Sequence, residues 1–152
     1  MTEHHVTKII SGGQTGADQG GLRAGQELGI VTGGTAPPGW RTDDGPAQEL
    51  LMHYGLVEGE SDPRTYPKRT RKNVLDSDGT VLFGRMNSPG CSLTIRCCDE
   101  PKKPYIVNPD YVELRRWIVD KHIHTLNVAG NRERTNPGVF ERTLITITRA
   151  LT

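Results

Sequence analysis

Several features that mark common classes of protein are missing from this 152-residue sequence. Its three cysteines are an odd number, so they cannot all pair within one chain, and none belongs to a CxxC pair typical of zinc sites. No apolar run approaches the ~20 residues that span a bilayer, and the N-terminus lacks the basic and apolar regions of a signal peptide. We therefore expect free thiols, a cytoplasmic location and no membrane partner.

An excess of either charge is also missing. Lys and Arg total 19 and Asp and Glu total 18, which gives a formal net charge of +1. This balance offers no electrostatic support for nucleic acid as a partner. The length fits one domain over residues 1–152, and the 18 glycines and 10 prolines predict many tight turns.

Short β-branched segments alternate with helical patterns along the chain. The predicted strands are 6–11, 30–31, 80–84, 105–107 and 125–129, and the predicted helices are 17–29, 46–54, 70–75, 91–99, 110–122 and 137–151. The β-branched run 143–148 is assigned to the last helix because the apolar stripe extends beyond it. The alternation predicts an α/β fold: a Rossmann-like three-layer sandwich with a mainly parallel sheet of about five strands and helices on both faces.

Four unusual loops follow predicted strands: 12–16, 33–45, 87–91 and 130–138. Ligands of parallel sheets bind beyond the carboxyl ends of the strands, so we expect the functional site among these loops. A further segment, 58–67, is polar and rich in turn-forming residues.

The most specific local signal is the sequence GGQTG between a predicted strand and a predicted helix. Glycines allow close approach of a ligand to the backbone, and a helix beginning at Ala17 would direct unpaired amides at an anion. The spacing fits neither a Walker A loop nor GxGxxG. We predict a phosphate or nucleotide site here, and the alternative is a tight structural turn. Thr15 and Asp18 have the spacing of a capping box, and Gly13→Val is expected to abolish binding while the fold persists.

The loop APPGWRTDDG contains Trp40, Arg41, Asp43 and Asp44. An indole can stack on a base, an arginine can pair with phosphate, and a carboxylate can accept from ribose or base donors. An equally weighted alternative is a rigid surface loop whose tryptophan covers the core.

Other polar groups favour structural roles. The basic segment 64–72 could contact phosphate, but a solvated helix face is the favoured interpretation. The acids in 76–78 precede the central strand at the wrong edge for a site, and Cys97 and Cys98 are expected in or near the core. His122 and His124 have no third ligand at an obvious spacing, so no metal site is predicted.

Four segments carry a resemblance to a known family: ISGGQTGADQGGLRAGQELGI, GGTAPPGWRTDDGP, TRKNVLDSDGTVLFG and LNVAGNRERTNPGVFER. In this order they resemble the circularly permuted YpsA-like family, which also carries the label of molybdenum carrier proteins. The family belongs to the SLOG superfamily of Rossmann-like domains. The resemblance implies a parallel sheet and a pocket for a nucleotide-like molecule, without implying a particular reaction.

The positions that match the family's motifs are Gly12, Gly13, Gln14, Thr15, Gly16, Asp18, Gly39, Asp44, Gly45, Asn73, Ser77, Asp78, Gly130, Glu133, Pro137 and Gly138. Two departures stand out. The stretch Ser88-Pro89-Gly90-Cys91 replaces the family's usual Ser-Gly-Gly-Thr, and Asn131 stands where the family often has proline. Lonely Guy enzymes, similar in fold, cleave N-glycosidic bonds with the glutamate of PGGxGTxxE, and this chain has no glutamate at that place.

These observations lead to three hypotheses. The first is a protein that binds a small phosphate-bearing ligand at the GGQTG turn, for carriage, sensing or sequestration of a nucleotide-derived signal. Its expected ligand-binding residues are Gly12, Gly13, Gln14, Thr15, Gly16, Asp18, Trp40, Arg41, Asp44, Ser88, Gly90, Gly130, Arg132 and Glu133. The second is a nucleotide N-glycosidase or phosphoribohydrolase with Glu133 or Asp44 as its acid. The third is a carrier of the molybdenum cofactor, whose phosphate would use the same turn. Similar proteins often self-associate, so a homo-oligomer is also expected.

Overall fold

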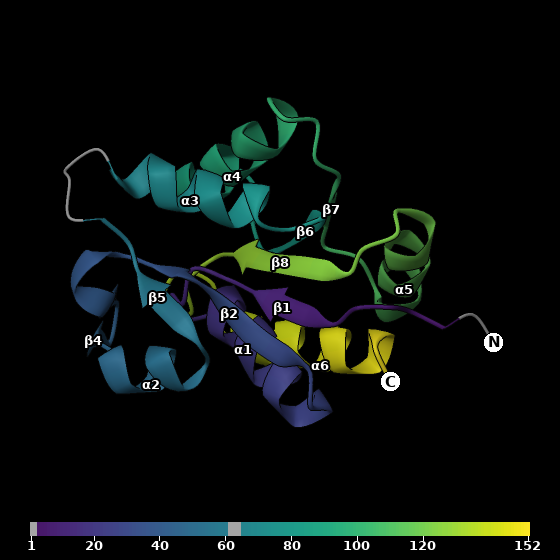
Figure 1. The fold of residues 1–152 in the computed structure, drawn as a ribbon, viewed down its shortest axis with the longest axis horizontal. Coiled ribbons are helices and arrows are strands. Elements are labelled where there is room, and N and C mark those ends of the chain that lie inside the picture. The colour runs from purple at the N-terminus through teal and green to yellow at the C-terminus, as the bar shows by residue number, and fades with distance from the viewer. Residues whose placement is uncertain (1–2, 61–64) are drawn as a thin grey trace.

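A six-stranded parallel sheet forms the centre of the molecule (Figure 1). The computed structural model describes residues 3–60 and 65–152. In these ranges the strands of the sheet are β1 (Lys8–Ile10), β2 (Val31–Ala36), β5 (Leu56–Glu58), β6 (Gly79–Phe83), β7 (Tyr105–Val107) and β8 (Thr125–Gly130). Their order across the sheet is β5-β2-β1-β8-β6-β7. A separate antiparallel hairpin consists of β3 (Arg41–Thr42) and β4 (Gly45–Pro46).

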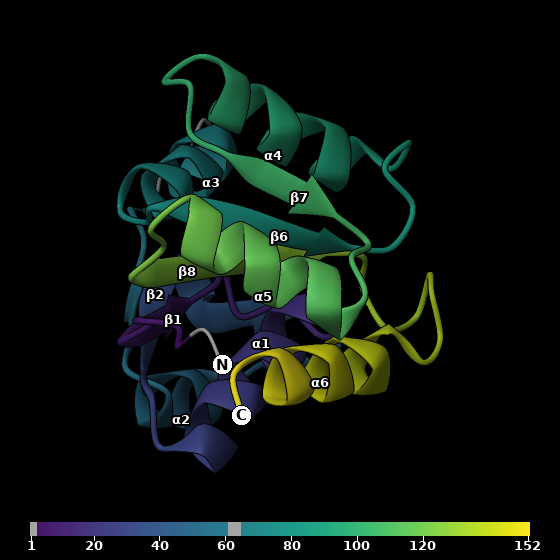
Figure 2. The ribbon, with the colours of Figure 1, turned by 90° about the vertical axis from the view of Figure 1, so that its right-hand side faces the viewer.

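Helices cover both faces of the sheet, which gives three layers (Figures 1 and 2). The helices are α1 (Ala17–Leu28), α2 (Gln48–His53), α3 (Thr65–Leu75), α4 (Pro89–Asp99), α5 (Tyr111–Asp120) and α6 (Val139–Ala150), with a short 3₁₀ turn at Pro38–Trp40. Helices α1, α5 and α6 pack together on one face, and α3 packs with α4 on the other. The predicted fold class is confirmed. No helix in the described ranges is long and apolar enough to cross a membrane.

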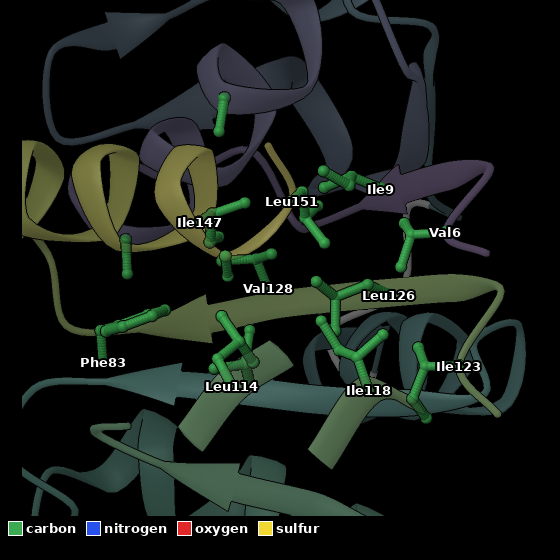
Figure 3. Close-up of a cluster of buried hydrophobic side chains, with 14 of the residues drawn as sticks. Val6, Ile9, Phe83, Leu114, Ile118, Ile123, Leu126, Val128, Ile147 and Leu151 are labelled. Atoms are coloured by element: carbon green, nitrogen blue, oxygen red, sulfur yellow. The ribbon is translucent and has the colours of Figure 1, made fainter. Parts of the chain in front are cut away.

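The main hydrophobic core lies between the sheet and the layer of α1, α5 and α6 (Figure 3). Phe83, Leu114, Ile118, Leu126 and Ile147 are among its fully or nearly fully buried side chains. Burying one such side chain stabilises the fold by about 1.5–3 kcal/mol relative to leaving it exposed. Packing between the sheet and this helix layer therefore holds the sheet in place, together with the first glycine-rich loop that leads into α1.

The opposite layer has a much smaller core. Val74 of α3 packs with Cys97 and Cys98 of α4, so the prediction that these cysteines lie in the core is confirmed. All three cysteines are free and buried. Because this apolar cluster is small, the layer of α3 and α4 leaves room for a polar cavity beside the carboxyl ends of the strands.

The structure corrects several predicted boundaries. The sheet has six strands rather than about five, because residues 56–58 form an edge strand. Residues 33–36, predicted as loop, form the last four residues of β2. Gly34 permits this, since its φ is +130° and a Cβ there would overlap the carbonyl oxygen of Ser11. The polar segment predicted at 58–67 falls partly on residues 61–64, outside the described residues.

The last helix is also shifted from its predicted start. It begins at Val139 rather than Pro137, and its N-cap is Gly138 in the left-handed conformation. The assignment of residues 143–148 to this helix is confirmed. The loop between β8 and α6 therefore covers residues 131–138, and it contributes to the site described next.

Candidate functional site

A cavity of about 460 Å³ lies beside the carboxyl ends of the central strands. Its walls come from the loop after β1, the segment after β2, the end of β8 and the loop after it, the first turn of α4, and one side of α3. The lining residues are Gly12, Gln14, Asp18, Pro37, Arg41, Arg69, Thr70, Asn73, Ser88, Pro89, Gly90, Thr94, Asn127, Val128, Ala129, Gly130, Asn131, Arg132, Arg134 and Thr135. The predicted location, beyond the carboxyl ends of parallel strands, matches this cavity.

Positive charge dominates the lining. Among the lining residues that the structure describes there are four arginines and one carboxylate, Asp18. The arginines are Arg41, Arg69, Arg132 and Arg134. A guanidinium group is always charged and can donate two parallel hydrogen bonds to a phosphate or carboxylate. The lining therefore suits an anionic ligand.

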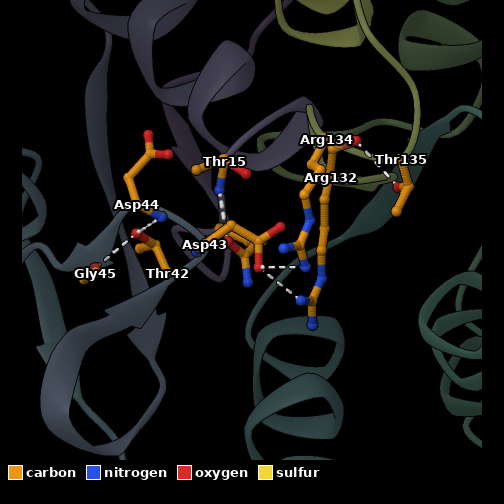
Figure 4. Close-up of polar contacts among 9 residues, drawn as sticks. Thr15, Thr42, Asp43, Asp44, Gly45, Arg132, Arg134 and Thr135 are labelled. Carbon is orange, nitrogen blue, oxygen red and sulfur yellow. Dashed lines mark hydrogen bonds and ion pairs between the residues drawn. The ribbon is translucent and has the colours of Figure 1, made fainter.

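Asp43 holds two of these arginines through ion pairs (Figure 4). Its Oδ1 atom lies 2.8 Å from Arg132 Nη1 and 3.7 Å from Arg134 Nη2. The Arg132 side chain is 45% exposed and that of Arg134 is 74% exposed, whereas the Asp43 side chain is only 12% exposed. Each ion pair therefore joins an exposed guanidinium group to a largely buried carboxylate, and a ligand anion at this edge would share both guanidinium groups with Asp43.

The β3–β4 hairpin carries Asp43 to this position. The Asp43 amide donates to Gln14 Oε1 at 2.9 Å, which ties the hairpin to the first glycine-rich loop. Thr42 Oγ1 donates to the Gly45 carbonyl at 2.7 Å and accepts from the Asp44 amide at 3.1 Å, which closes the turn. The hairpin thus links the loop after β1 with the loop after β8 at the edge of the cavity (Figure 4).

The first glycine-rich loop does not present the bare amides that the sequence predicts. The Gly13 amide donates to Ser11 Oγ at 3.2 Å, and the Thr15 amide donates to Gln14 Oε1 at 3.0 Å. The Ala17 amide donates to the Asn131 carbonyl at 3.1 Å. The prediction of unpaired amides is wrong at these positions, because the protein's own oxygens satisfy them.

Asp18 accepts from two further amides of this loop. The predicted capping box is wrong: the N-cap of α1 is Gly16, with no side-chain cap bond. Instead, Asp18 Oδ2 accepts from the Gln14 amide at 3.2 Å, and the carboxylate also accepts from the Gly12 amide. The carboxylate of Asp18 thus occupies the position that the sequence predicts for a ligand phosphate.

The pKa of Asp18 reflects this setting. Burial raises its pKa from 3.8 to about 6, although the nearby Arg69 guanidinium, the loop amides and Arg132 act in the opposite direction. A Cβ built on Gly12 would overlap Arg69 Nη1 and lie 3.1 Å from Asp18 Oδ2. The carboxylate and the Arg69 guanidinium therefore approach each other over Gly12, which only glycine permits.

Gly13 has a different role from the predicted one. Its φ is +82°, and a Cβ there would lie 2.9 Å from both Cδ atoms of Leu51. Leu51 belongs to a buried cluster beside α2. The expectation for Gly13→Val is therefore corrected: the substitution would disturb this packing and the turn, rather than fill a ligand site.

Eight of the fourteen predicted ligand-binding residues line the cavity: Gly12, Gln14, Asp18, Arg41, Ser88, Gly90, Gly130 and Arg132. Six do not: Gly13, Thr15, Gly16, Trp40, Asp44 and Glu133. Trp40 packs beside the cluster that contains Leu51, as in the alternative where the tryptophan covers the core. Asp44 is exposed and outside the cavity lining.

Glu133 serves the start of α6. Its carboxylate accepts from the Gly138 amide at 2.7 Å and from the Phe140 amide at 2.9 Å. These amides lie at the N-terminus of the helix, where a negative charge is stabilising. Neither predicted catalytic acid, Glu133 or Asp44, therefore faces the cavity.

Asn131, which departs from the family's proline, joins two loops. Its side chain accepts from the Arg85 amide at 2.5 Å and donates to Ser88 Oγ at 3.2 Å and Cys91 Sγ at 3.4 Å. Ser88 is the N-cap of α4 and accepts from the Cys91 amide, and Pro89 occupies the first helical position, which suits proline. The departures at Asn131 and Pro89 thus build the wall of the cavity around α4.

The sequence interpretation missed the contribution of α3. Arg69, Thr70 and Asn73 line the cavity, although a solvated face was the favoured interpretation of segment 64–72. The first residue of that segment lies outside the described residues. Arg69 and Asn73 are four positions apart and share a helix face, which was a usable signal. In residues 3–60 and 65–152, no group of three or more potential metal-binding side chains was found.

The layered parallel sheet and the cavity at its carboxyl edge define a Rossmann-like protein with a ligand site. Comparison with known proteins makes the assignment specific: the model of the circularly permutated YpsA SLOG family matches residues 9–151, so the chain belongs to this family. A solved structure from Syntrophus aciditrophicus SB, described as a "Putative molybdenum carrier protein", is similar, with 33% identity and a TM-score of 0.87. The match covers 99% of this chain and 98% of that one. No curated protein matches.

Proposed function

We propose that this protein binds a small phosphate-bearing molecule of nucleotide type in the cavity between α3, α4 and the carboxyl end of β8. The observation that carries the proposal is the convergence of four arginines on one cavity. The volume of about 460 Å³ falls within the usual range for small-molecule sites, ~300–1,000 Å³. Binding without a complete catalytic constellation would suit carriage, sensing or sequestration.

The role of each arginine differs. Arg41 is exposed and makes no ion pair or hydrogen bond within the described ranges, so its guanidinium is available to a ligand. Arg132 and Arg134 are held by Asp43 at the cavity edge, and Arg69 comes from α3. The phosphate would contact these guanidinium groups rather than the amides of the glycine-rich loop.

Titration calorimetry tests the proposal. The wild-type protein is titrated with nucleoside 5′-monophosphates, cyclic nucleotides and ADP-ribose, and the ligand that binds is then titrated into Arg41→Gln. Loss of a charged hydrogen bond to phosphate should weaken binding about tenfold or more. Arg23→Gln is the matched control, because Arg23 pairs with Glu27 on the exposed face of α1. Absence of binding by every compound, or equal affinities of the two variants, would count against the proposal.

Carriage of molybdenum is a second candidate, because the similar protein from Syntrophus aciditrophicus SB is described as a "Putative molybdenum carrier protein". The arginines would suit either molybdate or the phosphate of a molybdenum cofactor as cargo. Metal analysis of protein purified from its native host distinguishes this candidate. Molybdenum near one equivalent would support it, and its absence would leave nucleotide-type ligands favoured.

Cleavage of an N-glycosidic bond is the enzymatic alternative. An oxocarbenium-like transition state needs a nearby carboxylate, and within residues 3–60 and 65–152 the carboxylate that lines the cavity is Asp18, not Glu133 or Asp44. Chromatography after incubation with nucleoside monophosphates tests this alternative. Release of free base that disappears in Asp18→Asn but persists in Glu133→Gln would favour an enzyme over a binding protein.

A further inference from the structure

The cavity contains an anionic group of its own at the place where an anion was expected. Asp18 lies in the first turn of α1 and accepts hydrogen bonds from the amides of Gln14 and Gly12. In many Rossmann-like sites a ligand phosphate accepts from amides at this position. Here a second negative group at the loop would face the Asp18 carboxylate at close range.

The Asp18 carboxylate can accept further hydrogen bonds. A carboxylate has about four acceptor positions on its two oxygens, and the two loop amides use two of them. Asp18 is only partly buried and lines the cavity. Its pKa of about 6 leaves it mainly ionised at pH 7.5, when it accepts hydrogen bonds and cannot donate them.

We propose that Asp18 determines ligand specificity by accepting a hydrogen bond from a neutral hydroxyl or amino donor of the ligand and by repelling phosphate from the glycine-rich loop. This inference rests on the proposed binding of a phosphate-bearing ligand. It narrows the ligand class to molecules that carry both a phosphate for the arginines and a donor for Asp18. Nucleoside monophosphates and related sugar phosphates meet both requirements, whereas inorganic phosphate has no neutral donor separate from its anionic group.

The charges around Asp18 support separate contacts for the ligand phosphate and for the ligand's hydrogen-bond donor. Arg69 and Arg132 lie close enough to Asp18 to offset part of the effect of burial, which disfavours its ionised form. Arg41 and Arg134 add positive charge to the same cavity. A ligand phosphate can therefore avoid Asp18 and still contact guanidinium groups.

Calorimetry at pH 7.5 with defined probes tests the inference. Wild-type protein is titrated with adenosine 5′-monophosphate, its 2′-deoxy and 3′-deoxy analogues, inosine 5′-monophosphate and inorganic phosphate. The deoxy analogues remove sugar hydroxyls, and the inosine compound removes the exocyclic amine. We expect at least one of these three analogues to bind about tenfold more weakly than adenosine 5′-monophosphate, and inorganic phosphate to bind weakest.

The same titrations with Asp18→Asn identify the acceptor. The variant should bind adenosine 5′-monophosphate and the discriminated analogue with similar affinity, whereas the control Asp120→Asn on the exposed end of α5 should keep the wild-type ratio. Equal affinity of wild-type protein for all three analogues, or retained discrimination in Asp18→Asn, would overturn the inference and leave the proposed function intact. Failure of every probe to bind wild-type protein would instead refute binding of this ligand class, and the inference with it.

Discussion

Replacing Asp18 with asparagine should change how stability depends on pH. Burial raises the pKa of Asp18 from 3.8 to about 6 in the folded protein, whereas the unfolded chain should have an ordinary value. The folded state therefore binds the proton more tightly than the unfolded state between these two values. At 1.36 kcal/mol per pH unit, this difference corresponds to at most about 3 kcal/mol of unfolding free energy.

The sign follows from the raised pKa. The contribution of Asp18 to stability is fully present below about pH 4 and is lost as the pH rises through about 6. Other carboxylates act in the opposite direction. Against the effect of its partial burial, amides of Thr125 and His124 hold the pKa of Asp78 below its ordinary value, so its contribution is lost at low pH. Contributions that both proteins share, such as that of Asp78, cancel when the free energy of unfolding of the wild type is subtracted from that of the variant.

Urea denaturation of ligand-free protein between pH 4 and 8 measures this difference. The stability of Asp18→Asn relative to wild type should increase with pH by up to about 3 kcal/mol and level off above pH 7. Loss of one acceptor for the loop amides shifts the whole curve, but does not change its slope. Asp120→Asn should give a flat difference. A flat difference for Asp18→Asn as well would show that Asp18 is not buried against the loop as described.

Three further substitutions or treatments test structural assignments. Glu133→Gln should lower the free energy of unfolding by about 1 kcal/mol, because the charged cap on α6 is lost, and it should leave ligand affinity unchanged. A loss of ligand affinity without a loss of stability would place Glu133 in the site. Gly13→Ala should lower the urea midpoint by an amount equivalent to at least about 1 kcal/mol, because its φ is positive and Leu51 is in close contact; a stabilised variant would contradict this packing. Burial raises the pKa of Cys98 to about 11, so the thiols of native protein at pH 8 should react slowly with a thiol-specific disulfide reagent. All three cysteines should react rapidly once the protein is unfolded. Rapid reaction of the native protein would contradict their burial.

The fold was largely predictable because its strands are apolar and bounded by turn residues. Residues 79–83 are buried throughout, and the sequence 80–84 predicts them within one position. The edge strand at 56–58 escaped prediction because it is three residues long and two of them are exposed. The glycines of β2 suggested a loop, but Gly34 serves the close approach of β2 to Ser11.

The site was less predictable because side chains far apart in sequence decide it. GGQTG indicated a turn before a helix, and this is where the turn lies. The pattern could not reveal that Asp18 and Gln14 would satisfy its amides. In the same way, Glu133 matches the family's motif, yet its role as the cap of α6 depends on how the chain turns at Gly138.

A crystal structure of the protein grown with a saturating nucleoside 5′-monophosphate tests the central claim most directly. The account predicts that the phosphate contacts Arg41 together with Arg132 or Arg134, while the Asp18 carboxylate keeps its bonds to the glycine-rich loop. An empty cavity, or a phosphate seated on the amides of residues 12–16 with Asp18 displaced, would contradict it.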